Sequence, residues 1–513
     1  MTDTLASAPA TRHPAWIATA IAALMCLGIL GLNFESDFVV KSTSLAHKQQ
    51  LHAAAMNHTV IVATNHTVYV DRVIEKVVLK KTLVNAVDHN TAYVSHNYDN
   101  TTVHIVYSTS CDQPNRHFLS AALQVSASKV GQRGPITEII SGCSDEEVQR
   151  FASEPSFYHD YHRHFTPSYS PHPKSGITDD YSPYNKPFAL RHLLHTPPSS
   201  SNPAAVKGNM PVALMDADFI FFQPLRVNTG ADLSSFYHGE QRQGEEIQDV
   251  VADGHALAQD WTSYYGAGWF NPDNEDKKAA VCAGKPCMDV TSDDGREYYA
   301  GGGPPYILTK NDWLKMIDSY GDFVIAGRKL SKNWMVEMYA YGLAAGNHHI
   351  KHTLVTHLGP TWPQSEVHSW TFLDDDTPNP CDVASLDVVL PRHPPISVHY
   401  CQKYGYFDKE DAGFHFYKYH IPYDILECDA MLLQLPPPWQ WTDIPSLGLE
   451  GIDLVAKRHE VWTECTLAKI LNQVFLTAKE KLCPLGFNTH QGLPMSEPHQ
   501  RDSALPGGAP KEF

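Results

Sequence analysis

Two carboxylates between two apolar runs are the residues of this sequence that first suggest chemistry. The segment 212-VALMDADFIFFQPL-225 places Asp216 and Asp218 directly after one apolar run, 212–215, and directly before another, 219–222. Burying one unpaired carboxylate is costly, and two neighbouring carboxylates also repel each other. The pair is therefore a solvated turn at an edge strand or a site where both side chains hold one cation, since alternate side chains of an extended segment point to the same side.

The elements around this pair indicate a parallel α/β sheet. Residues 103–107 read as a buried strand, 117–131 as an amphipathic helix closed by a glycine, and 136–140 as a second strand. This strand–helix–strand order favours parallel pairing. Ligands of such sheets bind at the carboxyl ends of the strands, and Asp216 and Asp218 follow the strand 212–215 at such an end.

The remaining segments are predicted with less regular structure. Residues 153–186 are rich in Pro, Tyr and His and read as a loop, and 229–300 reads as a polar insertion. Residues 302–317 read as a glycine–proline turn, a short strand and a helix, 333–347 as a helix, and the region after 436-PPP-438 as two short amphipathic segments. The segment 68–84 fits a helix or a strand equally, and the tail from 484 has the composition of a disordered segment.

Composition and charge narrow the functional class. The chain has 513 residues, 42% of them hydrophobic, so it can form a large core. Its formal net charge is −18, which disfavours a general nucleic-acid-binding protein because such proteins carry a basic field.

The N-terminal region predicts a membrane anchor. Residues 15–32 carry no charge and are long enough to span a bilayer, with Arg12 before them and Glu35 and Asp37 after them. A cleaved signal peptide is the alternative. We expect a single-pass type II protein whose bulk is lumenal.

Sequons and cysteines agree with a lumenal location. Sequons begin at Asn57, Asn65 and Asn100, close behind the uncharged run. Nine cysteines follow that run, so disulfides are expected and at least one thiol stays unpaired within the chain. Cys282 and Cys287 are the pair that the sequence most favours.

Seven blocks in a fixed order carry a resemblance to a known family. They are HIVYSTSC (104–111), GQRGPITEIISGCSDEE (131–147), PSYSPHPKSG (167–176) with YNKPFAL (184–190), LMDADFIFFQPL (214–225), GGPPYILTKNDW (302–313), WMVEMYAYGLAA (334–345) and SVHYCQKYGYF (397–407). In these blocks the chain resembles the plant and algal hydroxyproline O-arabinosyltransferase and peptidyl serine α-galactosyltransferase group of Golgi glycosyltransferases. Some blocks are closer to one branch and some to the other, so the donor sugar stays open between arabinofuranose and galactose. The insertion at 229–300 is longer than the family leads us to expect.

The resemblance implies a GT-A-like α/β fold with a mixed, mostly parallel sheet, a UDP-sugar donor, Mn²⁺ or Mg²⁺, and retention of anomeric configuration. It also implies a Golgi membrane protein that acts on hydroxyproline- or serine-rich secreted proteins and takes no nucleic acid as a partner. The domain organisation follows as a cytosolic tail (1–14), a transmembrane signal-anchor (15–32), a lumenal stem (33–102), a catalytic domain (103–440), a helical extension (441–483) and a disordered tail (484–513).

The metal ligands are assigned on this basis. Asp218 is the expected direct ligand, and Asp216 binds the metal or the ribose hydroxyls. His399 matches a histidine that the family carries in its His-Tyr block, and two carboxylates with one imidazole suit Mn²⁺. A core histidine that is hydrogen-bonded to the backbone is the alternative for His399.

Donor contacts and catalysis are assigned to further positions. Lys186 is expected to pair with the diphosphate or the uracil, or else to be a solvated lysine at a helix start. Thr109 and Ser110 end the first strand, where they can touch the uridine. Glu337 lies among apolar and aromatic residues, so it pairs with a cation or acts on the sugar, and it is the candidate nucleophile if retention proceeds by double displacement. A front-face mechanism needs no such nucleophile.

Two other classes stay open at this stage. A phosphatase of the haloacid-dehalogenase type also places Asp-x-Asp after a buried strand, although there the motif lies near the start of its domain. A catalytically inactive, membrane-anchored binding protein is the other alternative. Hydrolysis of p-nitrophenyl phosphate against hydrolysis of UDP-sugars separates the first from a transferase.

Overall fold

The computed structural model describes residues 98–495, except for 175, 198–203, 243–246, 374–375, 383–385 and 407–413. The chain divides into two units, Met1–Ala92 and Tyr93–Phe513, and the first lies outside the described residues. The uncharged run 15–32, the stem segment 68–84 and the sequons at Asn57 and Asn65 therefore lie outside them too. Among the described residues, none of the helices is long and apolar enough to cross a membrane.

A seven-stranded mixed sheet, in the order β3-β2-β1-β4-β7-β6-β8, organises the second unit. Its strands are β1 (His104–Ser110), β2 (Ile136–Ser141), β3 (Tyr161–Thr166), β4 (Pro211–Met215), β6 (His255–Asp260), β7 (Gly302–Thr309) and β8 (Lys351–Val355). Neighbouring strands pair in parallel except at β7, which is antiparallel to both β4 and β6. The expected α/β class with a mostly parallel sheet is confirmed.

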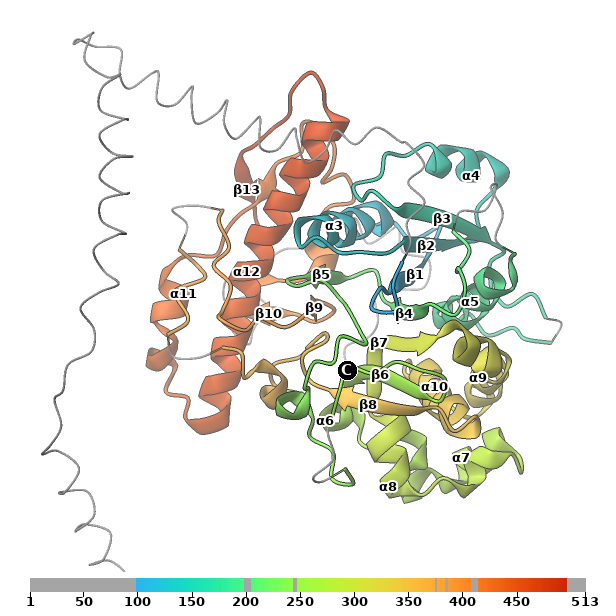
Figure 1. The fold of residues 1–513 in the computed structure, drawn as a ribbon. Helices are drawn as coiled ribbons and strands as arrows, with labels where there is room; N and C mark the ends of the chain where they lie inside the picture. Colours follow the sequence, from blue (N-terminus) through green and yellow to red (C-terminus); the bar gives the residue numbers. More distant parts are fainter. Residues whose placement is uncertain are drawn as a thin grey trace, which may run out of the picture. The chain divides into compact units, whose positions relative to one another are not determined.

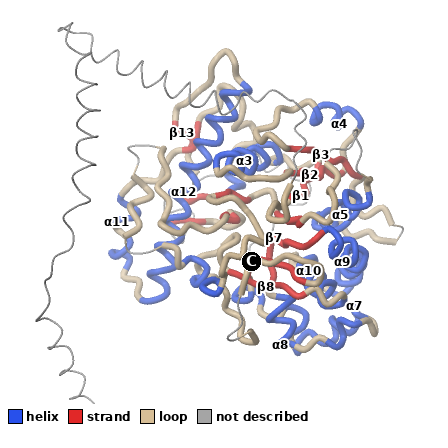
Figure 2. Tube along the Cα trace, in the orientation of Figure 1, coloured by secondary structure: helices blue, strands red, loops and turns tan. Residues whose placement is uncertain are grey.

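Helices lie on both faces of this sheet (Figures 1 and 2). The α-helices of the described chain are α3 (Arg116–Lys129), α4 (Asp145–Ala152), α5 (Asn185–His195), α6 (Thr262–Tyr265), α7 (Glu275–Cys282), α8 (Ser292–Gly295), α9 (Lys310–Leu330), α10 (Val336–Asn347), α11 (Trp439–Thr442) and α12 (Gly451–Leu482). Smaller paired strands are β5 (Phe219–Phe221) with β9 (Ser397–His399), β10 (Tyr404–Gly405) with β11 (His415–Phe416), and β12 (Leu432–Leu433) with β13 (Gln491–Leu493).

Two hydrophobic cores result, one on each face of the sheet. Ile105 and Tyr107 of β1 belong to the core that contains α3 and α12, whereas Val106 between them belongs to the core that contains α5, α9 and α10. Alternate side chains of a strand point to opposite faces, so a strand covered on both sides reads as a continuous apolar run. This explains why the sequence identifies β1 and β4 so readily.

The sequence misses the strands that lack such a run. β6 lies within the expected polar insertion 229–300, yet it is an interior strand between β7 and β8, with Leu257 in one core and Ala256 and Ala258 in the other. The edge strand β3 lies within the expected loop 153–186 and is mostly polar and half-buried.

Three further expectations are corrected. The segment Gly302–Thr309 is a strand from its first residue, not a turn, and a Cβ at Gly303 would lie 2.4 Å from the ring of Trp261, so glycine here allows a close approach. The region after residue 450 forms the single helix α12 rather than a short segment, because many of its residues are buried. The expected disordered tail begins with ordered chain, since Gln491–Leu493 pairs with β12, while residues beyond 495 lie outside the description.

The cysteines form four disulfides among the described residues. The pair Cys282–Cys287 confirms the sequence prediction. The others join Cys111 to Cys143, Cys381 to Cys465 and Cys428 to Cys483, and Cys401 is free. The expected unpaired thiol is thereby identified.

Candidate functional site

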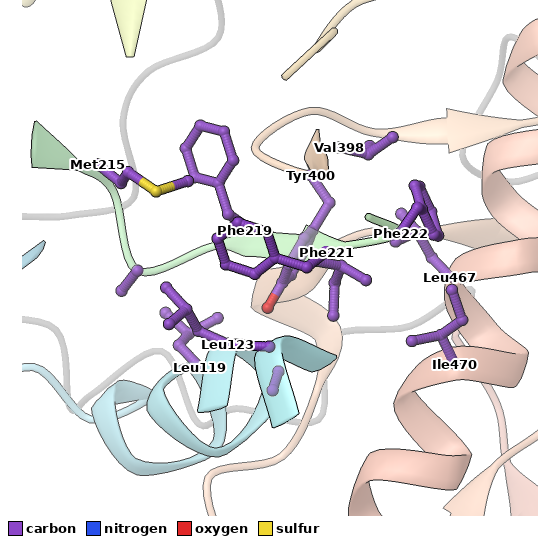
Figure 3. Close-up of a cluster of buried hydrophobic side chains, with 14 of the residues drawn as sticks. Leu119, Leu123, Met215, Phe219, Phe221, Phe222, Val398, Tyr400, Leu467 and Ile470 are labelled. Carbon is purple, nitrogen blue, oxygen red and sulfur yellow. The ribbon is translucent and has the colours of Figure 1, made fainter. Parts of the chain in front are cut away.

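The two carboxylates of the opening motif lie at the carboxyl end of β4. Asp216, Ala217 and Asp218 connect β4 to β5, and the side chains of Met215 and Phe219 on either side are buried. Figure 3 shows the strand β5 that follows this turn, with Leu119 and Leu123 of α3 on one side of it and Leu467 and Ile470 of α12 near its far end. The apolar flanks therefore fix the turn that carries the carboxylates.

The pairing of β5 with β9 brings His399 to this turn. Phe219 lies opposite His399 in the antiparallel ladder, and the Tyr400 N–H donates to the backbone carbonyl of Asp218 over 3.0 Å. The imidazole lies parallel to the rings of Phe219 and Trp261, with centroids 4.4 and 5.8 Å away. These contacts fix the plane of the ring.

His399 directs its nitrogens toward side chains. Its Nε2 lies 3.2 Å from Asp218 Oδ1 and 3.7 Å from Asp216 Oδ2, and its Nδ1 lies 3.4 Å from Thr361 Oγ1. The alternative of a core histidine satisfied by the backbone therefore does not describe this ring. Within the described part of the chain, Asp216, Asp218 and His399 form a group whose ligand atoms lie within 4.8 Å of one another, which fits one metal ion.

Asp218 is the more enclosed of the two carboxylates in this group. The residue is 4% exposed, and its second oxygen, Oδ2, accepts a hydrogen bond from Lys418. Burial alone would raise the pKa of Asp218, but Lys418 and His399 lower it well below its usual value of 3.8. Burial lowers the pKa of His399, yet Cys401 and Asp218 outweigh burial and raise it well above 6.5. Asp218 is thus held as an anion, with the Lys418 ammonium on one oxygen and the His399 ring beside the other.

Lys186 connects Asp216 to Glu337. Its Nζ lies 2.8 Å from Asp216 Oδ1 and 3.3 Å from Glu337 Oε2, and its side chain is 15% exposed. Burial disfavours the ammonium, but the two carboxylates outweigh that effect and raise the pKa of Lys186. Lys186 is consequently a paired lysine of the site and not a solvated one.

Glu337 has partners for both carboxylate oxygens. Oε1 accepts from the hydroxyl of Tyr320 and Oε2 from Lys186, while the backbone N–H of Glu337 donates to the hydroxyl of Tyr181 over 3.0 Å. The residue is 3% exposed. Burial raises the pKa of Glu337 above 4.5, and Lys186 and the Tyr320 hydroxyl oppose this rise. Of the two alternatives that the sequence left open for Glu337, pairing with a cation is observed, and a direct role on the sugar stays a prediction.

Thr109 and Ser110 end β1, the neighbour of β4 at the same edge of the sheet. The Thr109 hydroxyl donates to Glu138 Oε1 over 2.9 Å, and Glu138 also pairs with Arg116 at 3.2 Å. That hydroxyl is therefore engaged within the fold. Ser110 is half-buried, and a contact of either residue with a uridine stays a prediction.

The aromatic residues around Glu337 in the sequence separate into two groups. Tyr341 is fully buried and stacks on Tyr306 with centroids 3.8 Å apart, so it is a core residue. Trp334 is 47% exposed, and the partly exposed Tyr339 stacks on Trp269. Trp334 and Tyr339 are thus accessible to a ligand.

Three further charged residues of the site escape the sequence interpretation. Asp260 ends β6 at the same edge as Asp216 and is 3% exposed. Glu366 is 1% exposed, and burial raises its pKa to about 8, with repulsion from Asp260 in the same direction. Recognition of β6 as a strand would have identified Asp260. Lys418 and Glu366 have no comparable local signal, because only tertiary packing brings them here.

No family model matches the chain, and none of the curated proteins matches it. Among solved structures, one of an active-site mutant of LgtC has a TM-score of 0.31 and 11% identity, covering 58% of this chain and 87% of that chain. The apo structure of the bifunctional glycosyltransferase WbbM has a TM-score of 0.31 and 11% identity, covering 71% of this chain and 60% of that one.

A third solved structure is the galactosyltransferase LgtC in complex with donor and acceptor sugar analogs. Its TM-score is 0.30 at 12% identity, with coverage of 58% of this chain and 87% of that chain. Likeness at these TM-scores carries no argument about fold or activity. The function is therefore inferred from the residues of the site.

Proposed function

We propose that this chain is a GT-A-like, metal-dependent, retaining glycosyltransferase. It transfers arabinofuranose or galactose from a UDP-sugar to a hydroxyl of hydroxyproline or serine in secreted proteins. The observation that carries the proposal is the group of Asp216, Asp218 and His399 at the carboxyl edge of the sheet, with Lys186 beside it. The sequence blocks that resemble the hydroxyproline arabinosyltransferase and serine galactosyltransferase group support the choice of donor and acceptor.

The donor set of this group fits a divalent cation. Two carboxylates offer hard oxygen ligands and His399 offers an imidazole, a combination that suits Mn²⁺, with Mg²⁺ as the alternative. A cation held by these three residues would act as a Lewis acid and stabilise the negative charge that develops on the diphosphate. The parallel rings of Phe219 and Trp261 hold the imidazole so that Nε2 faces the carboxylates.

Lys186 and Glu337 act together beside this cation site. The carboxylate of Glu337 holds Lys186 against Asp216, so it keeps a positive charge next to the motif. Both oxygens of Glu337 already have partners, which favours a front-face mechanism over one in which Glu337 attacks the sugar. In this proposal Glu337 contributes by orienting Lys186, and Asp260 lies at the same edge, where the sugar hydroxyls need acceptors.

The location of the enzyme is part of the proposal. The uncharged run 15–32 anchors the chain in the Golgi membrane by one helix, and the catalytic part is lumenal. Secreted hydroxyproline- or serine-rich proteins meet the site in that compartment. A lumenal location of the catalytic part is consistent with the four disulfides of the described chain, because disulfides form in oxidising compartments.

Product analysis with a panel of donors tests the proposal. UDP-arabinofuranose, UDP-galactose and UDP-glucose are each incubated with hydroxyproline-rich and serine-rich peptides, with Mn²⁺ or with EDTA, and the peptide mass is measured. We expect a pentose or hexose addition that EDTA abolishes and Mn²⁺ restores better than Ca²⁺. Hydrolysis of p-nitrophenyl phosphate without any transfer supports the phosphatase alternative, and UDP binding without either reaction supports the inactive binding protein.

Matched variants identify the metal ligands. Asp218→Asn is expected to lose both the activity and the Mn²⁺-dependent rise in melting temperature, because mass action stabilises only a folded protein that binds the ion. Asp216→Asn is expected to lose activity while it retains some UDP affinity, and His399→Ala to respond less to Mn²⁺ without unfolding. Asp322→Asn, on the exposed face of α9, is the control and keeps both properties. Transfer at full rate in EDTA contradicts the metal-dependent mechanism.

A further inference from the structure

Lys418 is a charged residue of the site without a role in the reaction proposed above. Its Nζ contacts Asp218 Oδ2, and the lysine side chain is 11% exposed. The other oxygen of the same carboxylate lies 3.2 Å from His399 Nε2. Both oxygens of the expected metal ligand Asp218 therefore already have partners, one of which is an ammonium group.

A divalent cation and this ammonium compete for the single negative charge of Asp218. Like charges repel strongly where little solvent screens them, and the residues around Lys418 and Asp218 are buried. Cation binding there therefore weakens the pairing between Asp218 and the ammonium and favours withdrawal of Lys418. An unpaired ammonium in a buried site is itself unfavourable, so Lys418 then requires another anion.

The anion that enters this site with the cation is the diphosphate of the donor. We propose that Lys418 exchanges partners, neutralising Asp218 in the empty site and binding a diphosphate oxygen of the nucleotide-sugar in the filled site. This inference rests on the proposed function and deepens it, because it assigns a donor-binding residue. Lysine is a common partner of phosphate, and its long side chain allows the ammonium to change position while the backbone stays in place.

Charge balance gives the exchange a role in the reaction. As the acceptor hydroxyl oxygen bonds to the anomeric carbon, the bond between that carbon and the phosphate oxygen breaks, and its electron pair remains on the phosphate oxygen. This oxygen carries the added negative charge until it accepts the proton of the acceptor hydroxyl. Lys418, released from Asp218, provides a positive charge for this oxygen. Lys186 is less able to do so, because its ammonium lies between Asp216 and Glu337 and retains Glu337 as a partner when Asp216 binds a cation.

Binding measurements on the full chain test this exchange. Lys418→Met removes the ammonium and keeps an apolar stem of similar length. We expect its Mn²⁺ affinity without nucleotide to be at least ~10-fold tighter than that of the wild type, because the competing charge is gone. We expect its UDP affinity at saturating Mn²⁺ to be ~10-fold weaker, because a phosphate contact is lost. Free Mn²⁺ is measured by its electron paramagnetic resonance signal, and UDP binding by calorimetry.

A second buried lysine provides the control. Lys278 on α7 is 5% exposed, and its Nζ donates to the carbonyl of Val290 over 2.9 Å, away from the residues of the site. Lys278→Met loses a buried ammonium of the same kind, and its Mn²⁺ and UDP affinities should equal those of the wild type. If Lys418→Met does not fold, Lys418→Gln, which can still donate to Asp218, is measured in the same way.

The outcomes separate this inference from the proposed function. Unchanged Mn²⁺ affinity or unchanged UDP affinity in the folded Lys418 variant overturns the exchange, even if the wild type transfers sugar. The predicted opposite changes in the two affinities support the exchange, even if no sugar transfer is found and the transferase proposal fails. A gain in Mn²⁺ affinity that also occurs in Lys278→Met overturns it as well, since the effect then has no relation to Asp218.

Discussion

Glu366 offers a sharp test of the electrostatics next to the site. The residue is 1% exposed, and its Oε2 accepts a hydrogen bond from the backbone N–H of Thr361 at 3.3 Å. Burial raises its pKa from 4.5 to about 8, the Thr361 N–H opposes this rise, and Asp260 adds to it. Glu366→Gln removes the titration while it preserves the shape of the protonated side chain and its acceptor for Thr361.

The sign of the pH effect follows from proton binding. Between pH 4.5 and about pH 8 the folded protein keeps the proton on Glu366, whereas the unfolded chain has released it. The bound proton therefore stabilises the folded protein. Its contribution to the free energy of unfolding is fully present below pH 4.5 and is lost as the pH rises through about 8. The pKa of Glu366 differs between the unfolded and folded protein by about 3.5 units, and each unit corresponds to ~1.36 kcal/mol. The wild type therefore loses at most ~5 kcal/mol of unfolding free energy over this pH range, whereas Glu366→Gln does not.

Denaturant titrations of the two proteins in EDTA, at intervals from about pH 5 to about pH 9, measure this difference. Near pH 5 the variant and the wild type should be almost equally stable, and near pH 9 the variant should be the more stable one by several kcal/mol. The difference between the two curves of unfolding free energy against pH removes the contributions of the titratable groups that both proteins share. Glu146→Gln, at an exposed position of α4, is the control and should follow the wild type at every pH.

A stability difference that does not change with pH refutes the reasoning. It would mean that the Glu366 carboxyl titrates alike in the folded and unfolded protein, and hence that water or an unrecognised cationic partner reaches it. A variant that becomes less stable than the wild type as the pH rises would show that Glu366 is ionised and paired in the folded protein. Either result would also mean that the Glu366 carboxyl next to Asp260 carries a negative charge near neutral pH.

Three further predictions concern catalysis, covalent stability and topology. Glu337→Gln should lower turnover by at least ~100-fold while UDP binding survives, because Lys186 loses one of its two anionic partners. Steady-state kinetics measure the turnover and calorimetry measures UDP binding, and unchanged turnover contradicts the prediction. Replacing Cys381 and Cys465 by serine removes a disulfide between residues that are 84 positions apart in the sequence, and it should lower the free energy of unfolding by up to ~4.5 kcal/mol. Denaturant titration measures this change, and an unchanged unfolding midpoint contradicts a stabilising role of the disulfide. Protease treatment of sealed microsomes should spare the chain beyond the run 15–32, and digestion without detergent would refute the type II topology.

The sequence by itself determines the elements whose signals are local. The apolar run 212–215 predicts β4, and because ligands gather at the carboxyl ends of parallel strands, it also predicts that Asp216 and Asp218 lie at a functional edge. The pair Cys282–Cys287 is equally local, since only four residues separate the two cysteines. The apolar environment of Glu337 within its helix predicts that its carboxylate pairs with a cation or acts on the sugar.

Tertiary structure decides which distant segments meet. Asp218 and Lys418 are 200 residues apart in sequence, and the pairing of β5 with β9 that places His399 joins segments about as distant. Periodicity and spacing report only on neighbours within one element, so they do not show which helix or strand packs against another.

The interior strand β6 illustrates the same limit within the sheet. Its few small apolar residues have little strand propensity of their own, and pairing with β7 and β8 on its two sides defines it as a strand. Asp260 becomes part of the site only through that pairing. Sequence thus determines the chemistry that each segment carries, whereas the long-range pairing and packing of segments determine which charges are buried together, because burial and Coulomb interaction depend on distance in space and not along the chain.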